Sequence, residues 1–249
     1  MEPQLSHQVT DSVATVVIRN PAKRNAMTAD MWRALPPLLA GLARDPGVRA
    51  LVLTGEGRTF CAGADISTLQ GSAGPAQGLA VAAEEALAAF PKPTVAAVRG
   101  HCVGGGVQLA AACDLRLAED GALFGVTPAR LGIVYPSSST RRLVSLVGPA
   151  TAKFLLFTAE LIDTERALRT GLADEVLPEG ELDKRVAELT RTLVSRSQLT
   201  QAAAKEFANG REDRDGHWTE QARAGDDTAE GVAAFLERRT PRFTWTPPA

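Results

Sequence analysis

The chain has 249 residues, of which 45% are hydrophobic, and its 27 basic and 29 acidic residues leave a formal net charge of −2. This balance argues against a nucleic-acid-binding protein, which normally carries a basic stripe, and no apolar run approaches the roughly 18 residues of a membrane span. The N-terminus lacks the pattern of a targeting peptide. Cys61, Cys102 and Cys113 are widely spaced and form no CxxC pair, which argues against zinc and suits a reducing compartment. We therefore expect a cytoplasmic globular protein that binds no metal, nucleic acid or membrane.

Strand and helix signals alternate in the first half of the chain. Apolar and β-branched runs predict strands at Val13–Ile18, Val48–Thr54, Thr94–Val98 and Asp114–Ala118. Helical spacing between them predicts a helix with Thr28 as N-cap, a second over Leu79–Phe90, and an alanine-rich third that ends near Cys113. Pro36-Pro37 should kink or divide the first helix, and Gln70–Gly78 has the composition of a surface loop. This order predicts an α/β fold with helices packed on a sheet.

After Tyr135 the pattern becomes helical. Helical spacing of apolar residues recurs in Arg141–Val147, Ala150–Thr158, Thr164–Arg169, Leu182–Ser195, Thr200–Ala208 and Thr228–Arg238. Gly148-Pro149, Gly171 and Gly210 separate some of these segments. We therefore predict an α/β core over residues 1–195 and a helical C-terminal region over residues 196–249.

Catalytic side chains are sparse, and two turns of small residues are the strongest candidates for a site. The sequence has no Walker, G-x-S-x-G or G-x-G-x-x-G motif and no His/Asp/Glu cluster at metal-ligand spacing. Phe60–Ile66 follows a predicted strand, and Gly104–Gly106 lies between a strand and an apolar helix. A tight turn explains either segment. Alternatively, two such turns that face each other would offer backbone N–H groups to a developing oxyanion.

Six segments carry a resemblance to a known family. They are Asn20–Met27 (NPAKRNAM), Phe60–Ile66 (FCAGADI), Val98–Leu109 (VRGHCVGGGVQL), Cys113–Arg116 (CDLR), Gly171–Val176 (GLADEV) and Glu230–Pro241 (EGVAAFLERRTP). In this order they resemble the crotonase superfamily, also called the enoyl-CoA hydratase/isomerase family. The resemblance implies a spiral of ββα turns with a helical C-terminal region, an acyl-CoA thioester substrate, and assembly as a homotrimer or dimer of trimers. It implies no cofactor beyond the coenzyme A of the substrate.

The resemblance also assigns residues to the site. The backbone N–H groups of Ala64 and Gly105 would stabilise a thioester enolate. Contacts with coenzyme A would come from Arg24, Ala26, Ala62, Asp65 and Ile66.

Two positions depart from the hydratase pattern that the family implies. Typical hydratases have a glutamate where this chain has Gln108, and a second glutamate where it has Pro128. Hydration needs a carboxylate to take the proton of water and an acid to protonate the α-carbon. We therefore expect Gln108 and Pro128 to contact the substrate without supplying these groups, so that simple hydration is slow or lost.

The segment Thr127–Tyr135 resembles the methylmalonyl-CoA decarboxylase branch of the superfamily, which has a histidine where this chain has Ala64. Loss of CO₂ itself generates the enolate, so this chemistry needs an oxyanion hole, a desolvated carboxylate and a proton donor, but no general base. Tyr135 would orient the carboxylate or donate the proton. Its alternative role is structural, with the ring in the core and the hydroxyl at the rim.

We favour an acyl-CoA lyase that decarboxylates a malonyl-type CoA thioester. The alternatives are a hydratase or isomerase of an unusual enoyl-CoA, and a non-catalytic acyl-CoA-binding homologue. The remaining polar residues are weaker candidates. His101 is interpreted as a turn residue, and Asp114 and Arg116 as structural residues. Ser137–Ser139 would contact substrate or cap a helix that begins near Thr140.

Overall fold

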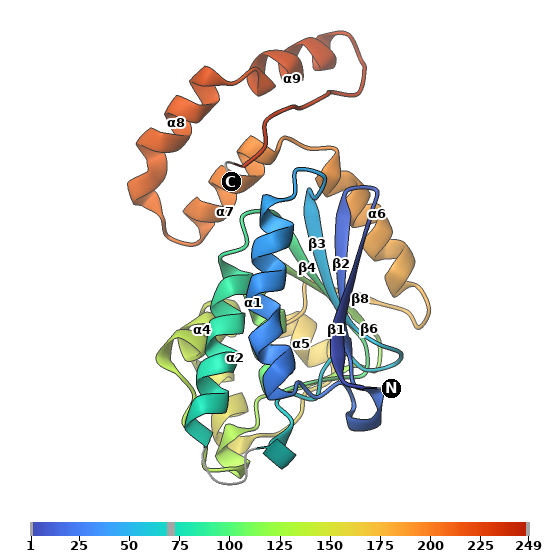
Figure 1. The fold of residues 1–249 in the computed structure, drawn as a ribbon, viewed down its shortest axis with the longest axis vertical. Helices are drawn as coiled ribbons and strands as arrows, with labels where there is room; N and C mark the ends of the chain where they lie inside the picture. The colour runs from blue at the N-terminus through green and yellow to red at the C-terminus, as the bar shows by residue number, and fades with distance from the viewer. Residues whose placement is uncertain (1, 69–72, 248–249) are drawn as a thin grey trace.

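A six-stranded sheet forms the centre of the molecule, in the strand order β1-β2-β3-β4-β6-β8 (Figure 1). The computed structural model describes residues 2–68 and 73–247. The strands of this sheet are β1 (Gln4–Thr10), β2 (Val13–Arg19), β3 (Ala50–Gly55), β4 (Thr94–Val98), β6 (Leu115–Glu119) and β8 (Glu175–Leu177). β1 pairs antiparallel with β2, and all other neighbours are parallel. Parallel neighbours require crossover connections, which the helices supply.

The sequence predicts the central strands β2, β3, β4 and β6 but misses the others. β1 is polar and largely exposed at the sheet edge, so no apolar alternation reveals it. It joins β2 through Asp11 and Ser12, which adopt positive φ angles of 50° and 63°. A second, two-stranded parallel sheet joins β5 (His101–Val103) to β7 (Leu123–Gly125). The sequence predicts only a glycine-rich turn at β5.

Helices cover both faces of the sheet. In the described residues they are α1 (Ala29–Arg44), α2 (Ala73–Ala88), α3 (Gly105–Ala112), α4 (Ser137–Thr158), α5 (Thr164–Thr170), α6 (Leu182–Val194), α7 (Gln198–Ala208), α8 (Asp215–Ala224) and α9 (Asp227–Leu236). Leu51 and Leu53 of β3 belong to the core that α1, α2 and α3 cover, whereas Val52 packs on the opposite face with α6. This is the alternation expected of a strand buried on both sides.

Two predictions for the first helices are wrong in part, and a kink at Pro36-Pro37 stays a prediction. α1 is not divided at Pro36-Pro37 but runs unbroken, because its buried residues hold one face on the sheet while the proline rings are half-buried and exposed. α2 begins at Ala73, so the predicted loop is wrong for residues 73–78, and residues 70–72 lie outside the described residues. Ala83 and Leu87, in the part of α2 that the sequence does predict, are fully buried in the core, and the helix extends from there back to Ala73.

α4 consists of two helical segments that meet at Gly148, where φ is 73°, as Gly148-Pro149 predicts. A serine cap for a helix beginning near Thr140 is wrong, because the helix already begins at Ser137 and its N-cap makes no side-chain hydrogen bond. The Ser139 hydroxyl instead donates to the buried carboxylate of Glu84 on α2, at 2.5 Å. This bond ties α4 to α2 across the core.

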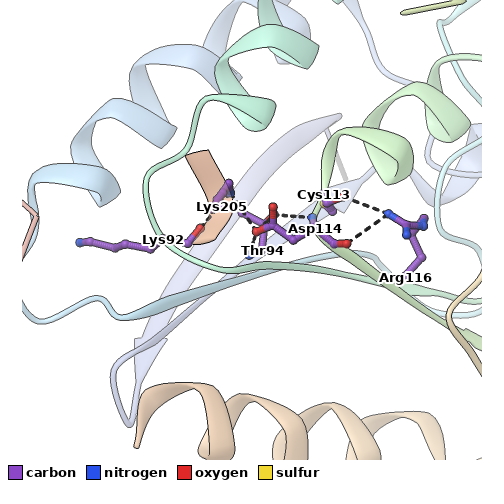
Figure 2. A network of polar contacts seen from close by, with 6 residues as sticks. All are labelled: Lys92, Thr94, Cys113, Asp114, Arg116 and Lys205. Carbon is purple, nitrogen blue, oxygen red and sulfur yellow. Dashed lines mark hydrogen bonds and ion pairs between the residues drawn. The ribbon is translucent and has the colours of Figure 1, made fainter. Parts of the chain in front are cut away.

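The C-terminal helices α7, α8 and α9 lie together at one end of the body (Figure 1). Figure 2 shows how α7 is held: Lys205 Nζ lies 2.8 Å from Asp114 Oδ2 and donates to the carbonyl of Lys92 at 3.1 Å. Asp114 also accepts from the Thr94 N–H at 2.8 Å, so the ion pair joins α7 to the start of β4. The predicted division between residues 195 and 196 falls between α6 and α7 and stays a prediction. Within the part of the chain that the model describes, no helix is both long and apolar enough to cross a membrane.

Candidate active site

The two small-residue turns lie against each other. The Cys61 N–H donates to the carbonyl of His101 at 2.9 Å, and the Val103 N–H donates back to the carbonyl of Cys61 at 2.9 Å. This parallel pairing places Gly63 beside Gly105: a Cβ on Gly63 would lie 3.1 Å from the Gly105 nitrogen. Only a residue without a side chain allows this approach. The turns therefore face each other, as the oxyanion hypothesis requires.

Two backbone amides at this junction are available to a ligand. Gly105 is the first residue of α3, so its N–H has no acceptor within the helix. Ala64 is held rigidly, because the carbonyl of Gly63 accepts from the Met27 N–H at 2.7 Å and the Asp65 N–H donates to the Met27 carbonyl at 2.8 Å. Among the described residues, neither Ala64 N–H nor Gly105 N–H donates a hydrogen bond. Gly105 is buried and Ala64 is half-buried. Amides without partners at such positions are uncommon, so this pair indicates a binding site for an oxygen atom.

Both residues line a cavity of about 110 Å³ that is partly open to solvent. Its apolar walls come from Trp32 of α1, Ala80 and Val81 of α2, and Ile133 and Pro136 between β7 and α4. The polar side chains that line it are Gln77, Gln108, Thr127 and Tyr135. No charged side chain lines the cavity in the described chain. Charges that develop inside are therefore poorly screened, and backbone dipoles act on them strongly.

Tyr135 supplies a hydroxyl group that can donate a hydrogen in this cavity. A Cβ on Gly104 would lie 3.7 Å from the Tyr135 hydroxyl and 3.6 Å from the Thr127 hydroxyl, so both groups reach the second turn. Burial, and after it the negative charge of Glu84, raises the pKa of Tyr135 above its ordinary value. The phenol is protonated at neutral pH, as an ordinary tyrosine is, and can donate a hydrogen bond or, to a strongly basic enolate carbon, a proton.

Residues 8–246 match the family model described as enoyl-CoA hydratase/isomerase. The chain belongs to the enoyl-CoA hydratase/isomerase family. It is 35% identical to the crotonyl-CoA hydratase of Syntrophomonas wolfei, in a match that covers 94% of this chain and 95% of the relative. A crystal structure of an enoyl-CoA hydratase/isomerase family member is 38% identical and superposes with a TM-score of 0.90 over 99% of this chain and 100% of the other. The enoyl-CoA hydratase of Bacillus anthracis is 28% identical with a TM-score of 0.90, over 96% and 98% of the two chains.

Membership of this enzyme family confirms the predicted fold class, a crotonase-like α/β body with a helical C-terminal region. An acyl-CoA thioester is consistent with the family as substrate. Among the described residues, no group of three or more His, Cys, Asp or Glu side chains converges. That the site works without a metal or cofactor stays a prediction.

Seven of the residues that the sequence assigns to the site line the cavity. They are Ala62, Ala64, Ile66, Gly105, Gln108, Pro128 and Tyr135. Gln108 lies one turn into α3, which carries Gly105 as its first residue, and Pro128 begins a short 3-10 helix (Pro128–Arg130). The fold thus brings together segments that are far apart in sequence.

Three assigned residues do not line the cavity. The carbonyl of Arg24 accepts from the Ala62 N–H at 3.0 Å and so supports the first turn. Ala26, two residues further along the chain, is buried. The carboxylate of Asp65 accepts from Lys23 Nζ at 2.7 Å and from Ser67; burial raises its pKa, but these hydrogen bonds outweigh burial and the net pKa is lowered. Contacts of these three residues with coenzyme A stay predictions.

Several lining residues were missed by the sequence analysis. Trp32 is 2% exposed and its ring borders the oxyanion position, since a Cβ on Gly105 would lie 3.0 Å from it. It sits on the apolar face of α1, where helical spacing predicts only core packing. Gln77 was missed because its segment was interpreted as a loop. Thr127 entered only as part of a motif, and nothing local indicates that its hydroxyl, like that of Tyr135, lies near Gly104.

The weaker candidates have structural positions. His101 belongs to β5, and its carbonyl pairs with the first turn. Cys61 and Cys102 are fully buried, and burial raises the pKa of both thiols, so neither is a reactive thiolate. Arg116, at one end of the network in Figure 2, donates to the carbonyl of Cys113. It also forms an ion pair with Asp174.

Proposed function

We propose that this enzyme stabilises a thioester enolate between the backbone N–H groups of Ala64 and Gly105, and forms it by decarboxylating a malonyl-type CoA thioester. The observation that carries the proposal is a cavity with two unpartnered amides and no charged side chain among its described lining residues. Such a site can hold an enolate oxygen but offers no carboxylate as a base. Family resemblance supports the same choice, because hydratases have glutamates at the positions of Gln108 and Pro128.

The reaction balances without a base. The bond between the α-carbon and the carboxylate breaks, CO₂ leaves, and the electron pair moves through the α-carbon onto the thioester oxygen. The two amides stabilise this oxygen, and in comparable sites each such donor lowers the free energy of the transition state by roughly 3–4 kcal/mol. The α-carbon then takes a proton from the phenol of Tyr135, which regains one from solvent. Apolar walls favour the step because they desolvate the substrate carboxylate while charge spreads toward the amides.

A hydratase or isomerase of an unusual enoyl-CoA is the second candidate. The similarity to a protein named crotonyl-CoA hydratase favours it. This reaction would need a proton acceptor, and the polar side chains Gln108, Thr127 and Tyr135 are poor bases at neutral pH. We therefore rank it below decarboxylation.

We further propose that the enzyme forms a homotrimer or a dimer of trimers. Val232, Phe235 and Leu236 lie on one face of α9 and are 56%, 82% and 74% exposed. An apolar helix face of this kind is typical of a surface that another chain covers.

Turnover of methylmalonyl-CoA and crotonyl-CoA, measured side by side by mass spectrometry, tests the proposal. We expect loss of CO₂ from methylmalonyl-CoA and slow or absent addition of water to crotonyl-CoA. Rapid hydration of crotonyl-CoA with methylmalonyl-CoA untouched would overturn the proposal in favour of the second candidate.

A further inference from the structure

Helix α2 holds the segment that carries Tyr135 at two points. Gln77 Nε2 donates to the carbonyl of Val134 at 2.5 Å, directly before Tyr135. Seven residues later on α2, Glu84 accepts from the Ser139 hydroxyl at 2.5 Å and forms an ion pair with Arg142. The tyrosine therefore lies between two anchors that belong to the same helix.

The anchors share a face of α2 with the wall of the cavity. Residues 77, 80, 81 and 84 follow the i, i+3, i+4, i+7 spacing of one helix face. Ala80 and Val81, between the anchors, line the cavity, as Tyr135 does. One rigid helix thus sets the distance between two walls of the site.

We propose that Gln77 and Glu84 are positioning residues that hold the hydroxyl of Tyr135 beside Gly104. The inference deepens the proposed function, on which it rests, because it explains how the proton donor is kept at the enolate. Neither residue is among those that the family resemblance assigns to the site.

The burial of Glu84 favours a positioning role over simple packing. Its side chain is 1% exposed, and a buried carboxylate is costly unless it is paired and hydrogen-bonded. Apolar side chains of similar volume commonly replace a buried ion pair without loss of stability. Apolar side chains do not reproduce the orientation that hydrogen bonds impose. The bonds of Glu84 to Ser139 and Arg142 fix the position of the first turns of α4, and therefore the position of Tyr135, which lies just before that helix.

The chain offers a direct probe, because Tyr135 is its only tyrosine. Full-length protein labelled with 3-fluorotyrosine gives one ¹⁹F resonance, which reports the surroundings of this ring without substrate. The variants are Gln77→Leu and Glu84→Gln. The matched control is Glu85→Gln, which alters the adjacent carboxylate. Glu85 pairs with the same Arg142 but is 48% exposed, whereas Glu84 is 1% exposed and also accepts from Ser139.

We expect both anchor variants to shift or broaden the ¹⁹F resonance and to lower kcat by about 10–100-fold with KM nearly unchanged, because small displacements of a reacting group cost this much. The control should leave the resonance and kcat close to wild type. An unmoved resonance and unchanged kcat in both anchor variants would overturn the proposal. If Glu84→Gln does not fold, the double variant Glu84→Leu/Arg142→Leu removes the whole pair and is measured instead.

The two readouts separate this proposal from the proposed function. If wild-type protein turns over no malonyl-type thioester, the proposed function fails, and the resonance still decides whether the anchors position Tyr135. If wild type is active and the anchor variants behave like the Glu85→Gln control, the proposed function stands and the positioning role is refuted.

Discussion

The role of the Gly105 amide can be isolated by comparing two substitutions at the same residue. Gly105→Pro removes the N–H, whereas Gly105→Ala retains it. Both add a Cβ that would lie 3.0 Å from the ring of Trp32 and 3.6 Å from the nitrogen of Ala64, so both disturb the packing similarly at this carbon. Proline is tolerated at the first position of a helix, where no intrahelical hydrogen bond is lost. The difference between the variants therefore reports the donor.

The loss of one oxyanion donor costs about 2.7–4 kcal/mol in comparable enzymes, which corresponds to a factor of roughly 100–1000 in kcat. We predict that Gly105→Pro is slower than Gly105→Ala by this factor in decarboxylation of methylmalonyl-CoA. The free energies of unfolding in urea should be similar for the two variants, which shows that the fold is retained. If the two proteins turn over within about threefold of each other, the Gly105 amide does not stabilise the transition state, and the reasoning is refuted.

Three further predictions concern the proton donor, the buried thiols and the C-terminal helices. Tyr135→Phe should lower kcat by about 100-fold or more, with binding of a non-reactive CoA thioester unchanged; equal turnover would leave Tyr135 a structural role. Burial raises the pKa of the three cysteine thiols, to about 12 for two of them, so the unfolded chain loses these protons first as pH rises. The free energy of unfolding in urea should then fall above about pH 8.5, by up to about 1.4 kcal/mol per pH unit for each thiol, and a flat profile to pH 10 would contradict this. Lys205→Met should cost about 1–2 kcal/mol and expose the chain between α6 and α7 to protease, because it breaks the 2.8 Å ion pair with Asp114; Lys184→Met, whose 3.5 Å pair is exposed, is the control and should change neither.

The sequence predicts most of the central sheet because buried parallel strands have continuous apolar runs, as in Val48–Thr54. It does not predict β1, since an exposed edge strand shows no such pattern. The start of α2 is missed for a related reason: glycine, proline and glutamine around Gln77 suggest a loop, and only the packing of the rest of the helix stabilises it. In both cases tertiary contacts outweigh local composition.

The site is predictable to the extent that it lies in two short segments. Phe60–Ile66 and Gly104–Gly106 are visible as turns of small residues, and the family resemblance indicates that they meet. The opposite wall is not visible, because Trp32, Val81 and Thr127 reach the cavity only through the packing of separate helices and loops. The hydrogen bonds from α2 to the Tyr135 segment likewise join residues 55–58 positions apart.

Decarboxylation through a protein-held enolate is the central claim, and its most direct test is turnover of methylmalonyl-CoA in D₂O, followed by mass spectrometry of the product. The account predicts release of CO₂ far above the uncatalysed rate, a product with one deuterium on the α-carbon, and loss of this activity in Gly105→Pro but not to the same extent in Gly105→Ala. Intact methylmalonyl-CoA after prolonged incubation, with crotonyl-CoA hydrated rapidly by the same preparation, would contradict it.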